Sequence, residues 1–115
     1  MNLKTFMKEF RLVQDKFYWK VYENGCLRGH LRGSNRKWEY CPITAVVKVK
    51  TGKMFRPGNY KKAAIHLNLN YYNWYTNLSR VIVNAADNDI KDTSYPNMRK
   101  NLLKATKAKG AEIKV

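Results

Sequence analysis

The sequence predicts an α+β fold with an N-terminal helix, a small antiparallel hairpin or meander, and then three to four helices. Three observations carry this prediction. Apolar residues recur at helical spacing near the N-terminus, an Asn-Gly pair separates two β-favouring stretches, and helical spacing returns in the second half. The chain has 115 residues, of which 44% are hydrophobic, so it is long enough to bury a core of its own.

Residues 2–14 form the first predicted helix, and Asn2 is suited to cap its start. Apolar residues recur there at three- and four-residue steps, which places them on one helical face: Leu3, Phe6, Met7, Phe10 and either Leu12 or Val13. A stripe of this kind predicts core packing.

Residues 17–22 are aromatic and β-branched and predict a strand. Asn24-Gly25 follows, and this pair supplies the positive φ angles that a two-residue hairpin turn requires. The return strand then runs from Cys26 to about Leu31, with its arginines on one side and its leucines on the other. After a second turn, Trp38 and Tyr40 predict a third short strand.

The segment from 42 to 50 is apolar and short, so periodicity alone does not separate helix from strand. Its three valines favour a strand, whereas Pro42 near the start and Gly52 past the end favour a helix. We expect a helix from about Pro42 to Lys50.

Three further helices are predicted, over 60–67 with Asn59 as cap, over 71–86, and from Ser94–Pro96 onward. In the last helix, three residues are expected to face inward: Met98, Leu102 and Ala105. Residues 1–108 therefore form a single basic domain, and 109–115 a flexible basic tail.

The basic residues outnumber the acidic ones by 23 to 8, so the formal net charge is +15. No Asp or Glu occurs from Tyr40 to Ala86. An excess of this size creates a positive field that attracts polyanions, and neutralising phosphates releases counterions from DNA or RNA. A lysine-rich composition also follows from AT-rich coding sequence, but this excess is beyond what solubility requires.

The predicted nucleic-acid-binding residues form two basic patches and a pair of stacking rings. Trp rings beside Arg can stack on unpaired bases, although core packing is the commoner fate of a single Trp. The residues are Arg28, Arg32, Arg36 and Lys37 in the first patch, Lys48, Lys50, Lys53, Lys61 and Lys62 in the second, and Trp19 and Trp38 for stacking.

Residues 60–78 also approximate a helix-turn-helix unit. Its small, turn and apolar positions fall near Ala64, Asn68, Trp74 and Leu78. Asn stands where such turns commonly have Gly, and the last apolar position is displaced by one residue. Two helices joined by a short loop are also common as plain packing, so both interpretations stay open.

The sequence carries no motif typical of catalysis, such as a Gly-rich phosphate loop, HExxH or GxSxG. We therefore expect a non-enzymatic protein without catalytic residues or cofactors. Residue type alone allows Cys41 as a nucleophile with His30 or His66 as base, but a buried thiol is the simpler interpretation. Structural zinc sites use two close pairs of ligands, and Cys26-x3-His30 is a single pair, so no metal is predicted.

The N-terminal segment is interrupted by charges and lacks the unbroken apolar stretch of a secretory signal. The longest stretch without formal charge, 63–79, contains four asparagines and is unsuited to span a bilayer. A cytoplasmic protein without a membrane partner is therefore expected. Its two cysteines should be reduced, and a Cys26–Cys41 disulfide is not indicated.

The stretches Cys41–Val46, Ala63–Leu69 and Ala85–Asp87 resemble small uncharacterised proteins encoded by phages and prophages. The similarity covers roughly the middle half of the chain. It implies no established chemistry, so no site residue is transferred. It does imply a phage protein that works in the host cytoplasm on host nucleic acid or host defence.

The leading hypothesis is a small, basic, non-enzymatic nucleic-acid-binding protein, phage-encoded as the resemblance implies. A second hypothesis is an anti-defence inhibitor that binds a host immune protein or its anionic nucleotide signal. A third is a minor virion protein that contacts the packaged genome. The same positive charge would serve all three, because each target presents phosphates or an anion-recognising surface.

Overall fold

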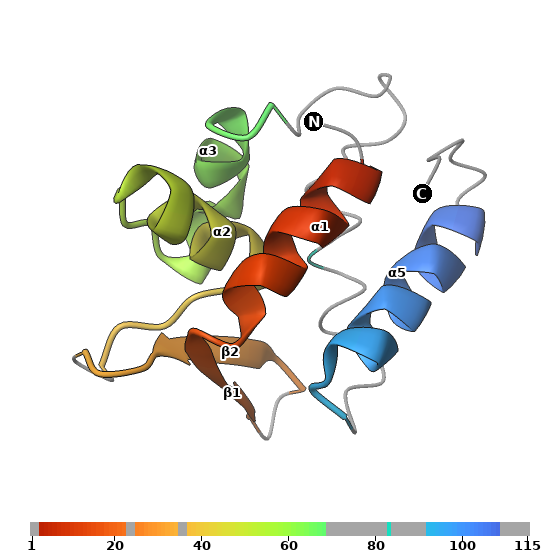
Figure 1. The fold of residues 1–115 in the computed structure, drawn as a ribbon, viewed down its shortest axis with the longest axis horizontal. Coiled ribbons are helices and arrows are strands. Elements are labelled where there is room, and N and C mark those ends of the chain that lie inside the picture. Colours follow the sequence, from red (N-terminus) through yellow and green to blue (C-terminus); the bar gives the residue numbers. More distant parts are fainter. Residues whose placement is uncertain (1–2, 23–24, 35–36, 69–82, 84–91, 109–115) are drawn as a thin grey trace.

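The computed structural model describes residues 3–22, 25–34, 37–68, 83 and 92–108 of the chain (Figure 1). A helix comes first, a two-stranded antiparallel hairpin follows, and further helices come after it, so the predicted α+β class is confirmed. None of the described helices is both long and apolar enough to cross a membrane. The elements are α1 (Leu3–Gln14), β1 (Phe17–Val21), β2 (Leu27–Leu31), α2 (Pro42–Thr51), the 3-10 helix η1 (Pro57–Asn59), α3 (Tyr60–Ile65) and α5 (Tyr95–Ala108).

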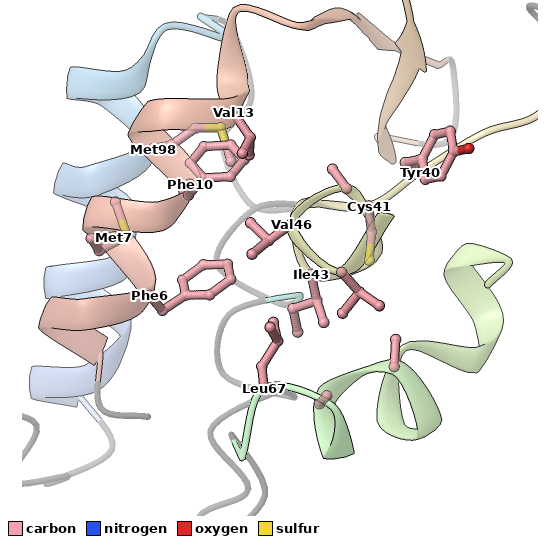
Figure 2. Packing of buried hydrophobic residues seen from close by; sticks show 14 of the residues in the cluster. Phe6, Met7, Phe10, Val13, Tyr40, Cys41, Ile43, Val46, Leu67 and Met98 are labelled. Carbon is pink, nitrogen blue, oxygen red and sulfur yellow. The ribbon is translucent and has the colours of Figure 1, made fainter. Parts of the chain in front are cut away.

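Helix α1 places one apolar face on the core, as its spacing predicts. Phe6 and Phe10 are fully buried, and Figure 2 shows both rings pointing from α1 toward α2. Val13 rather than Leu12 completes the buried stripe, because Leu12 is 73% exposed. At the C-terminal end of α1, the Gln14 side-chain amide donates to the Thr93 carbonyl oxygen at 3.0 Å. This bond ties α1 to the segment that leads into α5.

The hairpin pairs β1 with β2 from Phe17 opposite Leu31 to Val21 opposite Leu27. The predicted two-residue turn is wrong. The Tyr22 N–H donates to the Cys26 carbonyl at 3.0 Å, so these two residues face each other and three residues connect them. Gly25 adopts a φ of 81° and its N–H donates to the Tyr22 carbonyl at 2.8 Å. A turn followed by a left-handed glycine is the usual form of a three-residue hairpin connection.

The predicted third strand is also wrong, because only one residue pairs with β2. Tyr40 and Gly29 exchange two backbone hydrogen bonds, at 2.7 and 2.8 Å, as an isolated bridge. The chain enters α2 directly after Cys41, which ends the pairing on that side, and Trp38 and Glu39 on the other side are not in a strand. The bridge nevertheless fixes the segment before α2 against the edge of the hairpin.

Helix α2 is capped at both ends, which explains why a valine-rich segment is helical here. The Cys41 sulfur accepts from the Thr44 backbone N–H at 3.5 Å, and the Thr44 hydroxyl accepts from the Cys41 N–H at 2.8 Å. Pro42 occupies the first turn, where its missing N–H costs nothing. Gly52 ends the helix with a φ of 77°, which favours glycine. The helix predicted for this segment is confirmed.

Residues 42–47 of α2 are all buried. Figure 2 shows α2 between α1 and α3, with Val46 directed toward Phe10 and Ile43 toward Leu67. Because neighbours cover α2 on several sides, its sequence lacks the polar stripe of a surface helix. This is the physical reason why the periodicity of the segment is ambiguous.

The helix predicted over 60–67 is shorter in the structure and ends at Ile65. Asn59 precedes it, but its side chain makes no capping hydrogen bond. Met98 and Leu102 of α5 are buried, as predicted. The predicted helix over 71–86, the second half of the helix-turn-helix unit, the tail at 109–115 and the side chain of Ala105 lie outside the described residues.

Candidate nucleic-acid interface

The end of β2, the segment before α2 and the loop after α2 form a groove with a volume of about 290 Å³. Its walls are almost wholly apolar, although Ser34 and Lys48 are among the lining residues. A concave apolar site with a few polar groups is the usual form of a ligand site. The lining residues are Leu31, Ser34, Trp38, Tyr40, Lys48 and Met54.

Trp38 provides the largest aromatic wall of this groove. Its ring is half-buried and packs near Tyr40, with 6.3 Å between ring centroids. The Arg56 guanidinium lies over the indole at 4.8 Å from the ring centroid, in a cation–π contact. The indole Nε1–H is buried, and no residue in the described part of the chain accepts a hydrogen bond from it. A buried donor without an acceptor costs about 1–3 kcal/mol, so hydrogen bonding does not explain this placement.

Two cations lie at the groove, Lys48 in its lining and Arg56 over Trp38, and Arg32, which adjoins the lining residue Leu31, donates to the Asp15 carbonyl at 3.1 Å. The Lys48 ammonium lies 3.4 Å from the Gly52 carbonyl oxygen, a long contact that engages one of its three N–H donors. Arg56 covers Trp38, and three exposed cations adjoin lining residues in sequence: Arg32, Lys37 and Lys53. Glu39 is the single acid between residues 31 and 56. We call Arg32, Lys37, Lys48, Lys53 and Arg56 the groove cations.

Glu39 is engaged with the hairpin. Its carboxylate accepts a hydrogen bond from the Tyr22 hydroxyl at 2.7 Å. That bond is the largest cause of a raised pKa at Tyr22, and the positive charge of Arg28 acts in the opposite direction. Arg28 also donates to the Leu27 carbonyl at 2.8 Å. The structure therefore places Arg28 beside this network on the hairpin.

The hydrogen bonds that join Glu39, Tyr22 and His30 indicate which ring nitrogen of His30 carries the proton. The Tyr22 hydroxyl has one proton, which its bond to Glu39 uses, so its oxygen accepts from His30 Nε2 at 3.2 Å. In the neutral ring, Nδ1 is then the nitrogen without a proton. It is buried, and none of the residues that the structure describes bonds to it. His30 is thus held by a single side-chain partner, Tyr22.

Other predicted site residues lie away from the groove. Lys50 of α2 forms an ion pair with Glu9 of α1 at 3.0 Å, so an acid within the protein compensates its charge. Lys61 and Lys62 are exposed on α3 and do not line the groove. Arg36 lies outside the described residues.

Trp19 faces the core side of the sheet. Its indole N–H donates to the Gln14 carbonyl at 3.1 Å, and its ring lies 5.6 Å from Phe10 and 5.7 Å from Phe17, measured between centroids. Gly29 stands opposite on β2, and a Cβ atom there would lie 2.7 Å from the Trp19 ring. These contacts keep Trp19 outside the groove, so it is not included in the interface.

Five residues at the groove were not among the predicted site residues: Leu31, Ser34, Tyr40, Met54 and Arg56. Met54 and Arg56 belong to the acid-free stretch, from which other residues were selected by their charge. The contact of Arg56 with Trp38 depends on how the loop after Gly52 folds back beside the segment before α2. No local pattern in the sequence indicates that contact.

Cys41 is placed to cap a helix. Burial raises the pKa of its thiol, and hydrogen bonds from Thr44 oppose that shift. A raised pKa favours the neutral thiol, whereas nucleophilic cysteines act as thiolates. Both cysteines lie in the described part of the chain, and no disulfide joins them. Within the described ranges, no group of three or more His, Cys, Asp and Glu could hold a metal ion.

Comparison of the chain with protein-family models, curated proteins and solved structures gives no match.

Proposed function

We propose that this protein is a small, basic, non-enzymatic nucleic-acid-binding protein, and that the groove beside Trp38 is its interface. The observation that supports this proposal is the set of groove cations around an aromatic wall. Phosphates would pair with the cations, and a base or sugar would cover the apolar surface between them. A positively charged groove with aromatic side chains is a common arrangement for binding nucleic acid strands.

The arrangement supports a nucleic acid better than a compact anion does. The groove cations come from four separate segments: the end of β2, the segment before α2, α2 itself and the loop after α2. An extended strand of phosphates can contact several of them at once, whereas a single phosphate cannot. Each phosphate contact contributes a salt-dependent part of the affinity, because counterions are released.

A salt series of binding to labelled single-stranded DNA, RNA and duplex DNA tests the proposal. We expect tight binding at low salt that weakens as salt rises, by about 0.7 units of log affinity per log unit of salt for each single-strand phosphate contacted. Absence of binding to all three polymers at low salt would refute the proposal.

Two charge-matched double variants locate the interface. Lys48→Gln with Lys53→Gln removes two groove cations, and Lys100→Gln with Lys104→Gln removes two exposed lysines of α5. Helix α5 packs beside α1, on the side away from α2 (Figure 1). Each phosphate contact that is lost should lower the slope of log affinity against log salt by about 0.7. We therefore expect the groove pair to lower this slope by about 1.4 and the α5 pair to change it much less. Equal losses from both pairs would place the interface elsewhere.

A further inference from the structure

We infer that the groove binds one unpaired nucleobase, so that the protein prefers single-stranded nucleic acid to a duplex. This inference rests on the proposed function and adds the form of the ligand. It follows from the size of the groove, the chemistry of its walls and the charges beside it.

The size of the groove fits one small planar group. Sites for drug-sized molecules span about 300–1,000 Å³. The groove, at about 290 Å³, lies just below that range. It is therefore suited to a single base and not to a folded segment of another chain. The rest of a strand would run over the rim, where the groove cations lie.

The walls of the groove match the flat face that a base presents. Trp38, Tyr40 and Met54 offer aromatic and thioether surfaces to the flat face of a ring. The Ser34 hydroxyl donates to the Leu31 carbonyl at 3.0 Å, which leaves its oxygen as an acceptor. The lining is almost wholly apolar, so it is the flat face of a base that the groove would cover, with the Ser34 and Lys48 side chains beside it.

The charge around the groove selects a ligand with phosphates. Arg56 brings a positive charge to the Trp38 ring, 4.8 Å from its centroid. The Lys48 ammonium lines the same groove. A neutral apolar ligand would gain nothing from these cations, whereas a nucleotide has a phosphate one sugar away from its base. The complementarity therefore favours a nucleotide unit of a strand.

Only an unpaired base can use these walls. In a duplex, neighbouring base pairs cover both faces of each base, and its pairing edge is occupied. A duplex also carries a charge about every 1.7 Å of its axis, so a protein that recognised charge alone would not favour single strands. Preference for a single strand is thus a signature of the groove, separate from the positive field of the whole protein.

An abasic oligonucleotide separates the two contributions, because it keeps the phosphates and lacks the bases. We would compare oligothymidylate and oligouridylate of about ten nucleotides with an abasic strand and a duplex of equal length, at one low salt concentration. We expect either normal strand to bind about 5- to 150-fold more tightly than the abasic strand, which corresponds to stacking of one base. We also expect it to bind more tightly than the duplex.

The possible results separate this inference from the proposed function. Equal binding of normal and abasic strands, or tighter binding of the duplex, would overturn the inference and leave the proposed function in place. If none of the four polymers binds, both fail. Tighter binding of oligothymidylate or oligouridylate than of the abasic strand supports the inference, whether the sugar is deoxyribose or ribose.

A matched pair of surface variants then tests whether the base enters this groove. Met54 is 47% exposed in the groove wall, and Ile65 is 59% exposed on α3, so neither change opens the core. Met54→Ser should reduce the advantage of the normal strand over the abasic strand about fivefold and leave abasic binding unchanged. Ile65→Ser should leave both affinities unchanged. An unaltered advantage in Met54→Ser would overturn the placement of the base.

Discussion

Two tryptophans flank the same strand, β2, and their surroundings are opposite in kind. Trp19 lies across from Gly29 on the core side, with its N–H bonded to the Gln14 carbonyl at 3.1 Å. Trp38 lies in the groove wall, with a cation over its ring and no hydrogen-bond acceptor for its N–H among the described residues. Both are half-buried, so the exposed fraction alone does not distinguish them.

The difference shows that an aromatic ring near basic residues is not by itself a binding surface. Trp19 has its polar group satisfied and its ring covered by Phe10 and Phe17, so it maintains the fold. Trp38 has an unsatisfied donor and a ring beside an open groove, and it serves the interface that we propose. The predictions below test this division of roles, from the largest expected effect to the smallest.

The largest expected effect comes from Gly29→Ala, which would break the packing around Trp19. The new Cβ atom would lie 2.7 Å from the ring, and the hydrogen bond to Gln14 restricts the ring from moving away. We expect the free energy of unfolding to fall by about 2–3 kcal/mol, as overpacked cores do. Urea denaturation followed by circular dichroism measures this change.

Gly58→Ala is the matched control for that variant, because no atom lies within 4 Å of the added carbon. It should change the free energy of unfolding by less than about 1 kcal/mol, with stabilisation the expected direction. Similar losses from both variants would show that the Gly29–Trp19 contact is not a special constraint.

A pair of Trp→Phe variants compares the two rings directly. Trp19→Phe removes a hydrogen bond and part of a packed ring, so we expect a loss of about 2 kcal/mol in the free energy of unfolding. Trp38→Phe removes a donor that has no acceptor among the described residues, which offsets the lost contact area. We expect a change within about 0.5 kcal/mol there. Urea denaturation measures both changes. Equal losses in the free energy of unfolding at the two positions would show that Trp19 and Trp38 contribute equally to the fold.

The smallest effect concerns alkaline pH and the network beside the hairpin. A hydrogen bond to Glu39 raises the pKa of Tyr22 above 10.0, and burial raises the pKa of Tyr40 above the same value. Each phenol keeps its proton longer in the folded state than in the unfolded state. The free energy of unfolding is therefore highest below about pH 10 and falls as pH rises through the folded pKa.

Tyr22→Phe should make that alkaline decline shallower, because Tyr22 no longer titrates. The variant also leaves His30 without its side-chain partner, so its stability at neutral pH should be somewhat lower. Binding to oligothymidylate should be unchanged, since the network lies outside the groove. Denaturation at several pH values measures this decline. If the variant keeps the wild-type slope of stability against pH, Tyr22 does not contribute to the alkaline decline.

Much of the fold could be predicted from local patterns. The stripe of α1, the two strands and the Pro42 and Gly52 signals at the ends of α2 are properties of a few neighbouring residues, and the structure confirms them. The turn length and the missing third strand could not be predicted in this way. They depend on Gly25 taking a left-handed conformation and on α2 beginning directly after Cys41.

The candidate site could be predicted only in part. Charge and residue type select Trp38 and every groove cation except Arg56. Which cation forms an ion pair or contacts a ring depends on tertiary contacts. Lys50 lies two residues from Lys48 and has the same chemistry, yet Glu9 of α1 compensates one and not the other. Arg56 meets Trp38 across a helix and two loops. No periodicity in the sequence encodes either contact.

The close approach of Gly29 to the Trp19 ring also bears on how such a protein can diverge. A side chain at position 29 would destabilise the fold as long as the full ring remains at 19, so we expect these two positions to change together or stay fixed. Exposed positions in the loop after Gly52, such as Lys53 and Met54, carry no comparable reciprocal constraint. We therefore expect the core side of β2 to vary little, whereas the loop beside the proposed interface could be altered one residue at a time.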